Sequence, residues 1–404
     1  MFKNISRLLL LAALQMTVAG IGLGALHAEP APQVTAVHLS GGVIQPQVVT
    51  DSRGTIHMVY YKGDPASGNI FYSQHAKGAA AWSTPIRVNS QDNSAGAMGN
   101  IRGAQLAAGR DGRVHVVWNG STAARPRGPH NPAMPADSPY DGSPMLYSRL
   151  NDAGTAFEPQ RNLMQFTYGL DGGGSVAADK MGNVYVVWHA GGNGSTGEAQ
   201  RRVWVARSGD DGKTFGRETQ ASDSAMGACG CCSLRAFTDS KGILYILYRS
   251  ALNGVDRDIY LLKSPDGAKT FTAKLVHKWN INACPMSSES LVESSAGTIL
   301  SAWETKGQVY YGTVDEAGNV TTPVPATSTG QGSKYPVLAT NEAGQTLMAW
   351  AEGMGWGHGG SVAWQVYDKT GQPIPGAAGK QGGVPAWSLV TAYSRPDGSF
   401  TVVY

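Results

Sequence analysis

The chain has 404 residues, of which 53 are Gly and 21 are Pro, and only 15% are charged. This abundance of turn-forming residues, together with 10 Trp and 16 Tyr, is typical of an all-β protein with many short strands. The net charge is only +3 and the charged residues are scattered along the chain, which excludes nucleic acid as a partner.

The first 28 residues have the pattern of a secretory signal peptide. Lys3 and Arg7 precede an apolar run, and small residues close the segment at Ala28. We expect cleavage after Ala28, which leaves residues 29–404 as one mature domain in the periplasm or outside the cell. Leu26 fits the cleavage site poorly, so an uncleaved N-terminal anchor is the alternative. Only in that case do we expect a contact with the membrane.

One pattern recurs along the rest of the chain: a turn that ends in Gly precedes a short β-branched run that ends in an aromatic residue. The seven turn glycines are Gly54, Gly112, Gly182, Gly242, Gly297, Gly344 and Gly398. They are on average about 57 residues apart, and a period of this size, built from several short strands, predicts the blades of a β-propeller.

The seventh repeat ends after its second strand, at the end of the chain. Residues 33–39 can add a strand to it, so that both termini lie in one blade and no sheet edge is left free. We therefore predict an all-β, seven-bladed β-propeller that is closed by its N- and C-terminal strands. Six blades is the alternative, if the C-terminal repeat completes the first one.

Two consecutive repeats carry an Asp-box, Ser-x-Asp-x-Gly-x-Thr-Phe, in the hairpin between their third and fourth strands. Its residues are Ser208, Asp210, Gly212, Thr214 and Phe215 in the first copy, and Ser264, Asp266, Thr270 and Phe271 in the second, which has Ala268 at the glycine position. We expect the Asp to accept backbone N–H groups, the Gly to adopt a positive φ and the Phe to pack between sheets, which is a structural role.

On these motifs the chain resembles the sialidase-like Asp-box (BNR-repeat) propellers, in a branch marked by a Cys-x-Cys-Cys segment. The catalytic motifs that the resemblance would imply are not recognisable. Sialidases carry Arg-Ile-Pro where this chain has Val43 to Gln47, which includes no Arg, and they carry a nucleophilic Tyr where it has Trp387. No catalytic residue is therefore assigned. The candidate ligand-binding residues are Arg102, Arg235, Arg249, His189 and His358.

The four cysteines of the chain precede the innermost strands of the fourth and fifth repeats, and such loops meet at one mouth of a propeller channel. They are Cys229, Cys231, Cys232 and Cys284. Three interpretations remain open. The cysteines form disulfides between blades, or their thiolates bind a soft metal together with Met226 and Met286, or two of them form a redox-active pair. This ligand set suits Cu(I) and, less specifically, Zn(II).

We therefore expect an exported binding propeller that holds a small ligand, a metal or a glycan at the channel mouth, with copper as the candidate cofactor. A sialidase-like glycoside hydrolase that acts on extracellular glycans is the alternative. A scaffold propeller that binds a protein partner on its rim is the second alternative.

Overall fold

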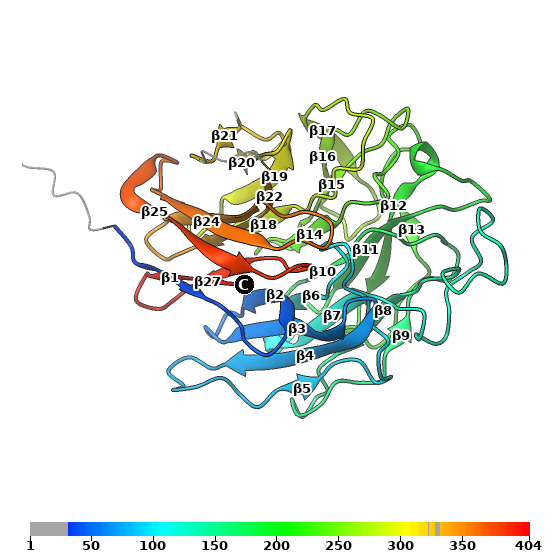
Figure 1. Cartoon of the computed structure of the whole chain (residues 1–404), viewed down its shortest axis with the longest axis horizontal. Coiled ribbons are helices and arrows are strands. Elements are labelled where there is room, and N and C mark those ends of the chain that lie inside the picture. Colours follow the sequence, from blue (N-terminus) through cyan, green and yellow to red (C-terminus); the bar gives the residue numbers. More distant parts are fainter. Residues whose placement is uncertain (1–30, 322, 328–331) are drawn as a thin grey trace, which may run out of the picture. The chain divides into compact units, whose positions relative to one another are not determined.

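A computed structural model describes residues 31–321, 323–327 and 332–404, so the predicted signal peptide lies outside the described residues. Pro32–Tyr404 folds as one unit that contains seven mainly antiparallel sheets. Figure 1 shows the strands of these sheets in chain order. The innermost strands of the sheets line a central channel. Within the described part of the chain, no helix is long and apolar enough to cross a membrane.

Six blades have four strands each, and sequence order is also the order from the channel outward. The first three blades are β2 (Val43–Thr50), β3 (Ile56–Asp64), β4 (Ser67–His75) and β5 (Ile86–Arg87); β6 (Gln105–Ala108), β7 (Val114–Asn119), β8 (Met145–Arg149) and β9 (Arg161–Asn162); and β10 (Ser175–Ala178), β11 (Val184–Ala190), β12 (Arg202–Ser208) and β13 (Thr219–Gln220). The next three are β14 (Leu234–Thr238), β15 (Leu244–Arg249), β16 (Ile259–Ser264) and β17 (Thr272–His277); β18 (Ser290–Glu293), β19 (Ile299–Thr305), β20 (Gln308–Val314) and β21 (Val324–Pro325); and β22 (Ser333–Thr340), β23 (Thr346–Glu352), β24 (Gly360–Tyr367) and β25 (Pro373–Val384). Two 3-10 turns, Arg110–Gly112 and Glu198–Gln200, lie between strands.

The seventh blade is built from both ends of the described chain. It consists of β26 (Thr391–Ser394), β27 (Phe400–Val403) and β1 (Val34–Val37), and β1 pairs in parallel with β27, with Val34 opposite Phe400. Both predictions, seven blades and closure by the N-terminal segment, are confirmed. The register is favourable because it also satisfies backbone groups beyond the strands: Leu39 donates its N–H to the carbonyl of Tyr404 at 2.8 Å.

The seven turn glycines of the repeat all join a first strand to a second strand and all have positive φ, from 71° at Gly112 to 88° at Gly182. Glycine adopts this region without a Cβ clash, so the recurring residue marks the tight turn of every blade. Sequence spacing could therefore predict the repeat, because each turn depends on a local conformational requirement.

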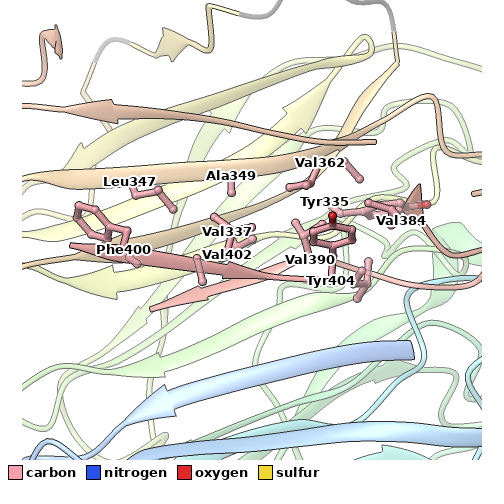
Figure 2. Packing of buried hydrophobic residues seen from close by; sticks show 14 of the residues in the cluster. Tyr335, Val337, Leu347, Ala349, Val362, Val384, Val390, Phe400, Val402 and Tyr404 are labelled. Carbon is pink, nitrogen blue, oxygen red and sulfur yellow. The ribbon is translucent and has the colours of Figure 1, made fainter. Parts of the chain in front are cut away.

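Neighbouring blades pack through aliphatic and aromatic side chains. Figure 2 shows this packing between the sixth and seventh blades, where Phe400 of β27 lies beside Leu347 of β23 and Val402 of β27 lies near Val337 of β22. Phe400 and Leu347 are fully buried. The inner strand of each blade contacts that of the next, including β26 with β2, so the ring of blades is closed.

Antiparallel pairing within the six four-stranded blades gives the molecule two structurally different ends. The connections between blades lie at the same end as the loops that join second and third strands, and we call this end the loop face. The turns that join first to second and third to fourth strands form the opposite end, the turn face. The Ser208–Phe215 and Ser264–Phe271 hairpins belong to the turn face.

In the hairpin after β12, the carboxylate of Asp210 accepts hydrogen bonds from the Thr214 N–H at 2.8 Å, the Thr214 hydroxyl at 2.6 Å and the Ser208 hydroxyl at 2.7 Å. Gly212 has a φ of 77°, and Phe215 packs edge-on against Tyr147 of the preceding blade at 4.7 Å. Ala268 adopts the same left-handed region in the second hairpin, with a φ of 67°. All these contacts are structural.

Candidate functional site

The loops before β14 and β18 carry all four cysteines and lie side by side on the loop face. Ser233 donates its N–H to the carbonyl of Ser287 at 3.0 Å, which joins the two loops directly. Cys231 and Cys284 form a disulfide across them, with Cα atoms 6.2 Å apart. Each loop connects two blades, so residues one repeat apart in sequence become neighbours.

The remaining two thiols lie beneath this disulfide. The sulfur of Cys229 is 2.9 Å from that of Cys232 and 3.5 Å from that of Cys231. All three sulfur atoms lie within 4.8 Å of one another. Cys229 and Cys232 are buried, Cys231 is half-buried and Cys284 is exposed. The four cysteines therefore extend from the surface, at Cys284, to the interior, at Cys229 and Cys232.

Hydrogen bonds and a buried cation control the charge of Cys232. The hydroxyl of Ser287 donates to the Cys232 sulfur at 3.6 Å and accepts a hydrogen bond from Nε of Arg249 at 2.9 Å. Burial raises the pKa of Cys232, but the Cys229 thiol and Arg249 outweigh burial and lower this pKa to about 6. The pKa of Cys229 is raised because Cys229 hydrogen-bonds to Cys232 and is buried. The pair is therefore one thiolate and one thiol at neutral pH.

A second arginine and a carboxylate hold the cysteine loop from the other side. Nη2 of Arg257 binds Oε2 of Glu198 at 2.6 Å, and Oε1 of Glu198 accepts the Gly230 N–H at 2.5 Å. Nε and Nη1 of Arg257 are buried without a hydrogen-bond partner. Arg257 therefore has unused hydrogen-bonding capacity beside Cys229, whose thiolate form its charge favours.

His189, at the end of β11, fixes the backbone of the cluster. Its Nε2 lies 2.8 Å from the carbonyl of Cys232, and Nη2 of Arg201 lies 3.3 Å from its Nδ1. Burial and the charge of Arg201 lower the pKa of His189 to about 4. The ring is therefore neutral at pH 7, with Nε2–H as donor and Nδ1 as acceptor.

The two methionines predicted as metal ligands contact other groups. The sulfur of Met226 accepts a hydrogen bond from the Tyr248 hydroxyl at 3.2 Å, and its side chain packs on the core between the third and fourth blades. Met286, with a left-handed φ of 49°, extends toward the loop before β6, where its Cε would lie 3.6 Å from a Cβ placed on Gly99. Among the described residues, the side-chain hydrogen bonds of the cysteine sulfurs join them to one another and to Ser287, not to these methionines.

Of the five residues predicted to bind a ligand, four have side-chain hydrogen bonds to protein groups, and among the described residues Arg235 has only one, to Gln105. Arg102 binds the Asp171 carboxylate and the Met98 carbonyl, Arg249 binds Ser287 and Glu304, and His189 contacts the Cys232 carbonyl. Arg235 lines the channel, and His358 is exposed in the loop between β23 and β24.

Sequence reasoning missed Glu198, Arg201 and Ser287 as parts of this site. Glu198 and Arg201 come from the loop between β11 and β12, which reaches the cysteines from the third blade. Of the three, only Ser287 could have been proposed from the sequence, because it directly follows the Cys-Pro-Met segment.

The channel has two compartments. A cavity of about 390 Å³ is lined by all seven inner strands, down to their ends at the turn face. Near the loop face only about 30 Å³ remains, between Ile101, Gln105, Arg235, Glu289 and Tyr335 among others. The channel is therefore nearly closed at the loop face, where the reactive side chains are those of the cysteine loops.

No protein-family model matches the chain, and no curated protein matches it. Solved structures do match. A protein of unknown function from Dyadobacter fermentans is 14% identical with a TM-score of 0.54, over 83% of this chain and 97% of that one. Penicillium chrysogenum α-L-arabinanase in complex with arabinobiose is 13% identical with a TM-score of 0.53, over 82% and 95%.

A Hadza microbial sialidase, Hz136, is 13% identical with a TM-score of 0.51, over 77% of this chain and 63% of the sialidase, so the chain spans less than two thirds of that protein. Identities this low establish a shared fold only. The fold is that of the sialidase-like seven-bladed propellers, as the hairpin motifs predicted.

Proposed function

We propose that this chain, a propeller of the sialidase-like fold, is an exported binding protein that holds one Cu(I) ion between cysteine sulfurs on its loop face. The observation that carries the proposal is the convergence of three sulfur atoms within 4.8 Å of one another. Thiolate sulfur is a soft ligand, and soft ligands select Cu(I) over the hard cations.

The number of sulfurs favours Cu(I) over Zn(II). Structural zinc sites take four protein ligands in a tetrahedron, whereas Cu(I) is satisfied by two or three sulfurs. Cys229 and Cys232 form a buried pair 2.9 Å apart, and Cys231 stands 3.5 Å from Cys229. The fourth sulfur, Cys284, is the exposed member of the set. No fourth ligand of the usual kinds is grouped with the three cysteines among the described residues.

The redox state of Cys231 and Cys284 decides how many cysteine sulfurs can bind the metal. A sulfur in a disulfide is not a thiolate, so Cys231 becomes a ligand only after the bond to Cys284 is reduced. We expect the oxidised protein to offer two sulfurs and the reduced protein three. Reduction should therefore raise the affinity for Cu(I), with Cys284 giving the reductant access from the surface.

The test is an anaerobic Cu(I) titration against a chromogenic chelator, on protein reduced with a phosphine and on oxidised protein, with elemental analysis for stoichiometry. Reduced protein should bind one copper per chain, and Cys229→Ser with Cys232→Ser should abolish binding. Cys284→Ser is the matched control and should bind like reduced wild type. Failure of the reduced wild type to bind, or binding that survives the double substitution, would contradict the proposal.

A glycan-binding role is the second candidate, and one surface feature favours it. Trp356, in the loop between β23 and β24, is 59% exposed and packs edge-on against Trp387 at 4.8 Å. An exposed aromatic ring offers a flat apolar surface on which a sugar ring can stack. The matching structures include an arabinanase with arabinobiose and a sialidase, which makes glycans the natural probes.

Arabinobiose binding by calorimetry and hydrolysis of a fluorogenic sialoside separate binding from catalysis. If the loop binds glycans, Trp356→Ala should remove arabinobiose binding while Tyr140→Ala, which changes another exposed aromatic residue, should leave it intact. Absence of both binding and hydrolysis in the wild type would exclude this candidate for these glycans.

A further inference from the structure

Arg235 is a charged residue of the channel that the copper proposal does not use. It lies on β14, the inner strand of the fourth blade, and it lines both the 390 Å³ cavity and the 30 Å³ cavity. The side chain therefore stands where the channel narrows. It forms the floor of the wide compartment, which extends from there to the strand ends at the turn face.

The guanidinium is poorly matched by protein groups. Among the described residues, its one hydrogen bond goes from Nη1 to Oε1 of Gln105, a neutral acceptor, and it forms no salt bridge. An arginine has five N–H donors, so most of this donor set has no protein acceptor. Burial lowers the pKa of Arg235 to about 10, which still leaves it charged at pH 7.

Glu289 is the acid whose charge acts on Arg235, but the two side chains form no ion pair. Both carboxyl oxygens of Glu289 are buried without a hydrogen-bond partner. Burial, the first cause, and the negative charge of Cys232 raise the pKa of Glu289 well above its usual range. The floor of the channel therefore presents a guanidinium that has no carboxylate partner among the described residues. Burial of such a charge is unfavourable unless a counter-charge is present.

The wide compartment fits an organic anion in size and lining. Its volume of about 390 Å³ lies in the range of small-molecule sites. Most lining residues are aliphatic, and Val48, Val49, Ala178 and Val292 among them are only half-buried. The other charged lining residue, Glu293, lies at the opposite end and already accepts the N–H and hydroxyl of Ser240 at 2.8 and 2.7 Å.

We propose that the channel binds a small organic carboxylate, which enters from the turn face, pairs its carboxylate with Arg235 and places its apolar part against the inner strands. This site is distinct from the cysteine cluster, and it does not depend on copper. A guanidinium presents parallel N–H donors that match a carboxylate in a bidentate pair, which makes this anion class the best complement.

The experiment is calorimetric titration of the apo protein with hexanoate, acetate, phosphate and chloride, each at constant ionic strength. Hexanoate should bind most tightly, because acetate lacks the apolar tail and the inorganic anions gain nothing from the walls. Arg235→Gln should weaken hexanoate at least about tenfold, as expected for loss of a charged hydrogen-bonded pair. Arg87→Gln, which removes an exposed arginine of β5, should leave it unchanged.

Thermal unfolding in anion-poor buffer shows whether a loss of binding in Arg235→Gln results from the missing guanidinium or from misfolding. Because Arg235 is uncompensated there, Arg235→Gln should not lower the melting temperature. A lowered melting temperature would mean that Arg235 is already paired within the protein, and this would overturn the proposal. So would equal hexanoate affinity in both variants, or no binding of any of the four anions by the wild type. Binding of phosphate alone would overturn the ligand class.

Discussion

Removal of the Cys231–Cys284 disulfide should destabilise the propeller measurably. The two residues are 53 positions apart, and the bond closes a loop that contains the whole fourth blade. In the chain-entropy account, a loop of this length stabilises the folded state by about 4 kcal/mol through restriction of the unfolded chain. We use the variant with both Cys231→Ser and Cys284→Ser, because Cys229 lies 3.5 Å from Cys231 and could otherwise replace the lost partner.

The expected change in melting temperature follows from the size of the unit. Unfolding entropy is about 2.1 cal/mol/K per residue, which gives about 0.8 kcal/mol/K for Pro32–Tyr404. A loss of about 4 kcal/mol then lowers the melting temperature by about 5 °C. Differential scanning calorimetry at pH 7 in thiol-free buffer measures this shift.

Two controls separate the bond from the side chains. Wild type treated with a phosphine should lose the same stability, and the double variant should no longer respond to the reductant. Cys229→Ser changes a neighbouring cysteine that is free of the disulfide and should keep the response. A double variant as stable as oxidised wild type, or a wild type indifferent to reduction, would refute the reasoning.

Three further changes test the hairpins, the site and the blade packing. Asp210→Ala should cost about 1 kcal/mol at pH 7, after discount for exposure; the pKa of Asp210 is lowered to about 2 by hydrogen bonds that outweigh burial, so the difference should vanish as the pH falls from about 4 through 2 in acid-unfolding curves. His189 has its pKa lowered to about 4, so the unfolded chain binds the extra proton first. Stability should therefore fall as the pH drops from about 6.5 to 4, and this slope should be shallower in His189→Gln. Phe400→Ala should cost about 3–5 kcal/mol in urea unfolding, whereas an equal stability would mean that the seventh blade is loosely packed.

The blade architecture could be predicted because its determinants are local. Each turn requires a positive φ, and Gly112 and Gly182 meet this need within a few residues of strands that alternate in sequence. The closing strand could be predicted by counting the strands of each repeat. The C-terminal repeat lacks an outer strand, so the N-terminal segment must add one, and β1 does so beside β27. The neighbourhood of the cysteine loops followed from the same repeat register.

The contacts within the site could not be predicted in this way. The partner of a cysteine among four depends on loop conformations such as the left-handed backbone at Met286, which no spacing rule gives. The place of Met226 beside the cysteines predicts a metal ligand, but it does not indicate that the Tyr248 hydroxyl donates to the Met226 sulfur. Glu198 reaches Arg257 from 59 positions away, and such pairs depend on how two blades face each other.

The charges around the cysteine cluster bear on which metal it would take. Glu198 binds Arg257 and Glu304 binds Arg249, whereas Arg201 contacts the neutral His189. In the oxidised protein, which offers only Cys229 and Cys232, a Cu(I) ion between two thiolates carries one net negative charge and so compensates one buried arginine. A Zn(II) ion with two thiolates is neutral and compensates none. In a desolvated site such a mismatch is costly, so the charge of Arg201 favours the monovalent ion. Arg201→Met should therefore weaken Cu(I) binding more than Zn(II) binding in the chelator competition on oxidised protein.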